Sequence, residues 1–297
     1  MTTPSPFRGL TVAVRAIAAL SLLTGAADAQ GEPGAPPSPM RQAAQLDRDG
    51  HTAQARLMFQ AMIDSAADPA AKAQAQRAMA MSYAFDRDCA NTVKYDGLVI
   101  AYWATREHAD PQNAFYQQGE MADEAARVCL DAGDLDAAEQ WYRRGYELGT
   151  KEPAPPTHPR SLWEYRLAHA LGRIAARRGD TTEARRQIAA ARRALDGDTA
   201  MAAQQERYFP YLVGYVALYT NDLATAEAQL TSAVGTRGNE RDAFMHCLLG
   251  LTLERLGRPD EAKALYRKAY DLASGHNPPA AFVRPFVREK LGLAGPR

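Results

Sequence analysis

This 297-residue chain has none of the common enzyme signatures. It carries no G-x-S-x-G nucleophile elbow, P-loop or dinucleotide fingerprint, and no C-x-x-C or H-E-x-x-H motif. Its six histidines are scattered from position 51 to position 276. The sequence therefore predicts a protein that is not an enzyme and that uses no cofactor and no metal.

An excess of charge of one sign is also lacking. The chain has 35 Lys and Arg against 35 Asp and Glu, so its formal net charge is zero. This balance gives no support to a general affinity for nucleic acid or for an anionic membrane. Runs of β-branched residues are few, while Ala, Arg, Leu, Glu and Gln are abundant, which favours helix throughout the chain.

Long hydrophobic runs are missing as well. The apolar stretch at residues 16–26 has about 11 residues, whereas a membrane span needs roughly 20. Arg8 and Arg15 precede it, and an A-x-A site follows at residues 27–29, which is the pattern of a secretory signal peptide. We expect cleavage near Ala29 and an exported protein, periplasmic or secreted, without stable membrane insertion. An uncleaved anchor is the alternative interpretation.

One spacing recurs five times along the chain. A Gly or Asn is followed by Ala at offset five, by a large apolar residue at offset nine and by a small or apolar residue at offset twelve. The five runs begin at Gly50, Gly133, Gly179, Asn221 and Gly257. A turn residue followed by this pattern indicates a helix start, with small side chains where a neighbouring helix crosses closely. Recurrence at one phase predicts a stack of repeated helix hairpins.

These hairpins resemble the tetratricopeptide repeat family. The clearest unit is residues 243–275, whose matching positions are Leu249, Gly250, Leu253, Gly257, Ala262, Tyr266 and Ala269. It departs from the motif at His246, where Trp is common, and in residues 70–107 Lys94 takes the place of the small alanine. The resemblance implies an all-α, right-handed solenoid of about six antiparallel hairpins, ended by a capping helix after Pro278.

Prolines and glycines divide the predicted stack. After the signal peptide at 1–29, residues 30–39 form a flexible Pro/Gly-rich spacer. Divergent hairpins follow at 40–149, a Pro-rich linker at 150–160, and clearer hairpins with the capping helix at 161–297. The linker cannot be helical, and we expect it to hinge the stack.

The three cysteines are too few for a disulfide scaffold. Cys89 lies at the start of a predicted second helix, and Cys129 lies near the end of the next first helix. Both positions fall at the same end of an up-down stack, so an exported protein could bond them. Two buried thiols are the alternative. Cys247 is expected to be a small core residue.

The resemblance implies that the first helices of successive hairpins line a concave groove that holds a partner segment. Gly172 and Gly214 take the place of Gly250 in two earlier, adjacent first helices. Opposite these glycines, one helix carries a basic stripe and the next a phenolic stripe. The stripes are Arg166, His169, Arg173 and Arg177, and Tyr208, Tyr211, Tyr215 and Tyr219. Arginine binds carboxylates bidentately, and tyrosine offers wide apolar contact with a hydroxyl group. These eight residues are predicted to bind a peptide with an acidic group.

Three other interpretations stay open for the two stripes. The arginines can form an ordinary solvated face, and the tyrosines can pack between neighbouring helices. The preceding first helix has Glu120, Asp123, Arg127 and Asp131 at the same phase, so its acids can neutralise the arginines. We expect an exported, non-catalytic module that binds an unidentified protein or peptide. The alternative is a self-associating scaffold or assembly factor of the cell envelope, acting as a homo-oligomer.

Overall fold

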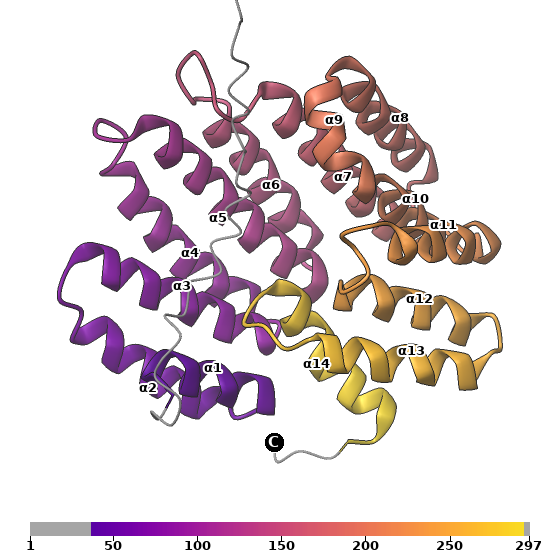
Figure 1. Ribbon diagram of the computed structural model, residues 1–297, viewed down its shortest axis with the longest axis horizontal. Helices are drawn as coiled ribbons and strands as arrows, with labels where there is room; N and C mark the ends of the chain where they lie inside the picture. The colour runs from indigo at the N-terminus through magenta and orange to yellow at the C-terminus, as the bar shows by residue number, and fades with distance from the viewer. Residues whose placement is uncertain (1–36, 294–297) are drawn as a thin grey trace, which may run out of the picture. The chain divides into compact units, whose positions relative to one another are not determined.

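The computed structural model describes residues 37–293, and every regular element in this range is helical (Figure 1). The predicted signal peptide and most of the spacer lie outside the described residues. Six antiparallel pairs follow one another, which confirms the all-α class and the predicted hairpins. The pairs are α1 (Pro39–Asp49) with α2 (Thr52–Asp64), α3 (Pro69–Phe85) with α4 (Cys89–Ala104), α5 (Pro111–Ala132) with α6 (Leu135–Gly149), α7 (Arg160–Arg177) with α8 (Thr181–Gly197), α10 (Phe209–Tyr219) with α11 (Leu223–Gly235), and α12 (Ala243–Arg255) with α13 (Pro259–Leu272).

One short insertion interrupts this order. The helix α9 (Thr199–Gln205) and a 3-10 turn at Glu206–Tyr208 connect the fourth pair to the fifth. The helix α10 then begins at Phe209, with Pro210 in its first turn. None of the helices within residues 37–293 is long and apolar enough to cross a membrane.

A residue in the left-handed conformation joins the two helices of every pair. Its φ angle lies between 56° and 93° at Gly50, Arg87, Gly133, Gly179, Asn221 and Gly257. In the four pairs from the second to the fifth, an aspartate follows and caps the second helix. Asp134, for example, accepts a hydrogen bond from the Ala137 N–H at 3.1 Å. A left-handed residue followed by a capping aspartate therefore fixes where these second helices begin.

The turn at Arg87 corrects one sequence assignment. Counting five residues from Arg87 leads to Thr92, which is fully buried and donates its hydroxyl to the Ala80 carbonyl. Lys94, which the sequence placed at this small position, is exposed. The assignment was wrong because no glycine marks this turn, although arginine adopts the same left-handed conformation there.

Glycines permit close helix crossings in the later hairpins. A Cβ atom added at Gly214 would lie 2.7 Å from the Leu230 side chain. One added at Gly250 would lie 2.9 Å from the Tyr266 ring. Both distances are shorter than carbon–carbon contact, so an alanine at either position would force the helices apart.

The Pro-rich linker is held against α5. Its buried Glu152 accepts backbone hydrogen bonds from Thr157 and His158, and the Pro155 carbonyl accepts one from Gln112 of α5 at 2.8 Å. Beyond the linker, Trp163 of α7 packs against α5 and α6. The linker thus contains no helix, as predicted, and its backbone is tied to the preceding pair.

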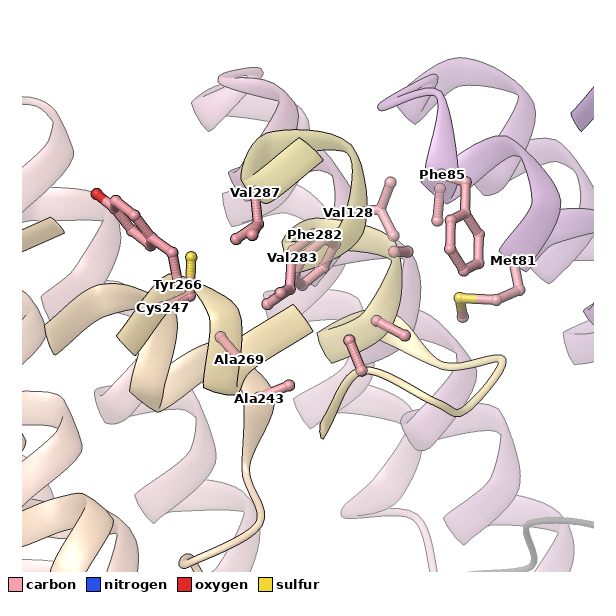
Figure 2. Packing of buried hydrophobic residues seen from close by; sticks show 14 of the residues in the cluster. Met81, Phe85, Val128, Ala243, Cys247, Tyr266, Ala269, Phe282, Val283 and Val287 are labelled. Carbon is pink, nitrogen blue, oxygen red and sulfur yellow. The ribbon is translucent and has the colours of Figure 1, made fainter. Parts of the chain in front are cut away.

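The last helix, α14 (Pro278–Leu291), packs on α12 and α13 but also contacts α1, α3 and α5. Phe282 and Val283 lie in one buried cluster with Met81 and Phe85 of α3 (Figure 2). Val128 of α5 belongs to the same cluster. The helix therefore covers the last hairpin, as predicted, and in addition joins it to the first three.

Polar contacts also connect the chain end to α1. The Arg284 Nε and an Arg288 amino group donate to the Arg48 carbonyl at 2.7 and 2.8 Å. The His276 Nε2 lies 2.8 Å from Asp47 Oδ2, and Asp47 accepts a second bond from Ser82. Both sets of contacts bring the last segment to the C-terminal end of α1, where carbonyls lack helical partners.

A disulfide bond joins Cys89, at the start of α4, to Cys129 of α5, with Cα atoms 4.7 Å apart. These are the two cysteines that the sequence placed at the same end of the stack. Cys247 of α12 is buried and free.

Candidate functional site on the first helices α5, α7 and α10

Twelve residues opposite the helix-crossing positions form a polar inner face. They are Glu120, Asp123, Arg127 and Asp131 of α5, Arg166, His169, Arg173 and Arg177 of α7, and Tyr211, Tyr215 and Tyr219 of α10, together with Tyr208, which lies in the 3-10 turn before α10 and not on the predicted first helix. The structure brings the two predicted stripes together as neighbours along α7 and α10. Contacts between the stripes decide which of these side chains can reach a partner.

Arg173 is the centre of the inner face. It is only 8% exposed and donates to the hydroxyls of Tyr142 at 2.9 Å and Tyr211 at 3.2 Å. Its guanidinium carbon also lies 5.8 Å from the ring centroid of Tyr215. Among the described residues it has no carboxylate within ion-pair distance, so phenol oxygens and aromatic faces replace the usual counter-ion.

Arg177, one turn further along α7, has a similar surrounding but is less covered. It donates to the Tyr215 hydroxyl at 3.4 Å, and its guanidinium carbon lies 4.9 Å from the ring centroid of Tyr219. Arg177 and Tyr219 are both half-buried, whereas Tyr215 is only 2% exposed. The exposed edge of the network therefore consists of one arginine and one tyrosine.

The acids of α5 neutralise one end of the basic stripe. Arg166 forms an ion pair with Glu120, and an Arg127 amino group lies 4.0 Å from the same carboxylate. Burial raises the pKa of Glu120, but the two guanidinium groups outweigh it and the pKa is lowered overall. The interpretation that acids of α5 neutralise the arginines thus holds for Arg166. It does not hold for Arg173.

Asp123 lies deeper, against α6. A Cβ atom added at Gly145 would come within 2.4 Å of its Oδ1, so only glycine leaves room for the carboxyl group. Burial raises the pKa of Asp123 to about 7, against the opposing effect of Arg166. Its charge therefore changes near neutral pH, in the middle of the arginine residues.

His169 is another buried polar residue of the inner face, beside Arg173 and Asp123. Its ring lies between Tyr165 and Tyr211, with centroids 5.8 and 5.3 Å away, and its Nε2 has no hydrogen-bond partner among the described residues. Burial and the adjacent Arg173 lower the pKa of His169 well below its usual range. The imidazole is neutral at physiological pH and acts as a packing group.

The eight predicted residues thus divide into two sets. His169, Arg173, Tyr211 and Tyr215 are buried and form the floor of the inner face. Arg166, Arg177, Tyr208 and Tyr219 are half-buried and remain accessible to a partner. Tyr142 also belongs to this network, although its position nine residues after Gly133 marked it only as the large apolar residue of the repeat. Its place on a second helix gave no signal that it would meet Arg173.

A match to a known family lies one hairpin beyond this face. Residues 245–276 match the tetratricopeptide repeat family model. The matched range covers most of α12 and all of α13, so it coincides with the hairpin in which the repeat spacing is most regular. Among curated proteins, none matches this chain.

A tetratricopeptide repeat in an all-helical array suggests a protein–protein interaction module, typically without catalysis. Within residues 37–293 there is no group of three His, Cys, Asp or Glu side chains placed to hold a metal ion. The inner face itself combines arginine–tyrosine hydrogen bonds with the acids of α5.

Proposed function

We propose that this protein is a non-catalytic module that binds a peptide or protein segment on the inner face of α5, α7 and α10. The observation that carries the proposal is the state of Arg177. It is half-buried and held by Tyr215 and Tyr219. Asp131 of α5 attracts it, but within the described range no carboxylate lies within ion-pair distance of it. A guanidinium positioned in this way can take a partner carboxylate without first releasing another.

Arg127 extends this surface onto α5. Its Nε donates to the Asp123 carbonyl, and its nearest carboxylate oxygen is 4.0 Å away on Glu120. With 37% of its side chain exposed, it retains free N–H groups for a partner. Tyr208 and Tyr219 add half-buried apolar area with hydroxyl groups, which suits a segment with an acidic group beside apolar residues.

We further propose that the protein works after export, in an oxidising compartment. The Cys89–Cys129 disulfide supports this, since such bonds persist mainly outside the cytosol. The alternative is a self-associating scaffold in which the terminal helix or the convex face would make the contact. The apolar side of α14 packs on α12, α13 and α3 of its own chain, which leaves less of this helix to contact a second copy.

The test is a selection of peptides from a displayed random library, followed by affinity measurement. We expect enrichment of sequences with Asp, Glu or a free carboxyl terminus. Arg127→Gln and Arg177→Gln should each weaken binding at least about tenfold, because each removes a charge-assisted hydrogen bond.

Arg178→Gln is the matched control. This neighbour of Arg177 points away from the inner face and pairs with Asp136 and Glu139. It should bind the selected peptides as the unmodified protein does. Enrichment of neutral sequences, or equal binding by the Arg177 and Arg178 variants, would show that the inner face is not the site.

A further inference from the structure

A buried acid replaces the hydrophobic residue of the second hairpin. The residue nine positions after the left-handed turn is large and buried or half-buried in five of the six hairpins. These residues are Phe59, Tyr142, Ile188, Leu230 and Tyr266. Counting nine from Arg87 leads to Asp96, which is 0% exposed. A carboxyl group thus occupies the position where the other second helices pack against their neighbours.

Asp96 has no hydrogen-bond partner for either oxygen among the described residues. The nearby cation is Arg77 of α3, but its guanidinium already binds Glu124 of α5, with N···O distances of 2.8 and 3.3 Å. Glu124 is itself buried, so a second carboxylate beside it would be repelled. The two other charged groups that act here are Arg127 of α5 on Asp96, and Glu120 of α5 on Arg77.

An ionised carboxylate cannot remain in such a place without a large cost in free energy. Burial, followed by the repulsion of Glu124, raises the pKa of Asp96 well above its usual range. The carboxyl group is consequently protonated while α4 lies against α3 and α5, and it ionises when the helices separate into water.

The disulfide bond joins the same two helices. Cys89 is the first residue of α4, Cys129 lies on α5, and Asp96 is two turns further along α4. The contact between α4 and α5 therefore has a covalent link at one end and an unpaired buried acid in its middle.

We infer that the contact between α4 and α5 is a proton-sensitive joint of the array, opened by ionisation of Asp96 and held by the Cys89–Cys129 bond. The sign follows from proton binding. The closed joint holds a proton that the open joint releases, so raising the pH favours opening. Above the ordinary pKa of an aspartate, the open joint has lost this proton while the closed joint still holds it. As long as the closed joint holds it, each further pH unit lowers the ratio of closed to open joint about tenfold.

The test measures hydrogen exchange of the full chain at pH 5 and pH 8, expressed as protection factors so that the intrinsic pH effect is removed. We expect protection of α4 amides to fall at least about tenfold from pH 5 to pH 8, while α13 amides change less. Asp96→Asn keeps the side-chain shape and removes this ionisation, so its α4 protection should fall less between pH 5 and pH 8 than that of the unmodified protein. Equal pH dependence in Asp96→Asn and the unmodified protein would overturn the inference.

The contribution of the disulfide is tested with Cys89→Ser/Cys129→Ser. In this variant the fall in α4 protection between pH 5 and pH 8 should be larger than with the bond intact. An identical fall would refute the holding role of the disulfide. If this variant does not fold at pH 8 but folds at pH 5, that outcome supports the joint, and adding Asp96→Asn should restore folding at pH 8. Failure of peptide binding at the inner face leaves this inference unaffected.

Discussion

The packing of Trp163 allows a sharp test of how the third and fourth hairpins are joined. The indole is 1% exposed, and an added Cβ at Gly149 would lie 2.1 and 2.2 Å from its Cε2 and Cζ2 atoms. The ring cannot withdraw, because an added Cβ at Gly119 would already lie 2.4 Å from its Cη2. Gly149→Ala must therefore displace α7 from α6, and overpacking of this kind costs about 1–3 kcal/mol.

Gly197→Ala provides a matched control. Gly197 also ends a helix, α8, but an added Cβ there would meet no atom within 4 Å. Its φ lies outside the left-handed range, so alanine should be neutral or stabilising by about 0.4–1 kcal/mol. The two variants change the same atoms at the same kind of helix end and differ only in the neighbouring ring.

Thermal unfolding followed by circular dichroism measures the difference. A loss of about 2 kcal/mol should lower the Tm of Gly149→Ala by roughly 4–8 °C, whereas Gly197→Ala should keep or raise it. Trp163→Phe combined with Gly149→Ala should recover part of the loss relative to the two single variants, as a double-mutant cycle would show. A Gly149→Ala protein as stable as the unmodified one would refute the reasoning that the indole is fixed between two glycines.

Three further outcomes are expected. Phe282→Ala should lower the free energy of unfolding by about 3–5 kcal/mol. Because the ring packs in one cluster with residues of α3 and α13, hydrogen exchange should become faster in both helices. Faster exchange in α13 alone would contradict the joint cluster. Because the folded pKa of Asp123 is raised from 3.8 to about 7, its contribution to stability is complete below about pH 4 and is lost as pH rises through 7. Asp123→Asn should therefore lessen the decline in unfolding free energy between pH 5 and pH 8, by at most about 3 kcal/mol, and an unchanged decline would count against a neutral Asp123. Lys290→Ala removes a half-exposed ion pair with Glu254 and should lower the unfolding free energy, measured by urea denaturation, by no more than about 1 kcal/mol.

The sequence predicted the features that depend on neighbours in the chain. A left-handed glycine and a capping aspartate act within a few residues, so the hairpin at Gly133 and Asp134 could be located without a structure. The helical period likewise placed Arg173 and Tyr211 on adjacent stripes. The sequence did not predict the turn at Arg87, because a non-glycine residue in the left-handed conformation has no distinct sequence pattern.

What the sequence could not predict depends on how helices approach in space. The same phase that would expose Tyr211 to a partner also lets it pack against Arg173, and periodicity cannot separate the two outcomes. Arg177 is partly accessible and Arg173 is buried, although the two lie only one helical turn apart. The reach of α14 to α1 depends on the summed rotation of all hairpins between them, which no local pattern contains.

The contacts of α14 also bear on how the chain folds. Arg284 and Arg288 bind a carbonyl that lies 236 and 240 residues earlier, and His276 meets Asp47 across 229 residues. Repeat arrays usually fold from local contacts, but these contacts close a loop of nearly the whole chain, which slows folding. During synthesis α1 and α3 emerge first, yet Met81 and Phe85 gain their cover only when the last residues are made. Until then the first hairpins expose an apolar surface. A chaperone that binds such surfaces would therefore bind the N-terminal hairpins of this protein.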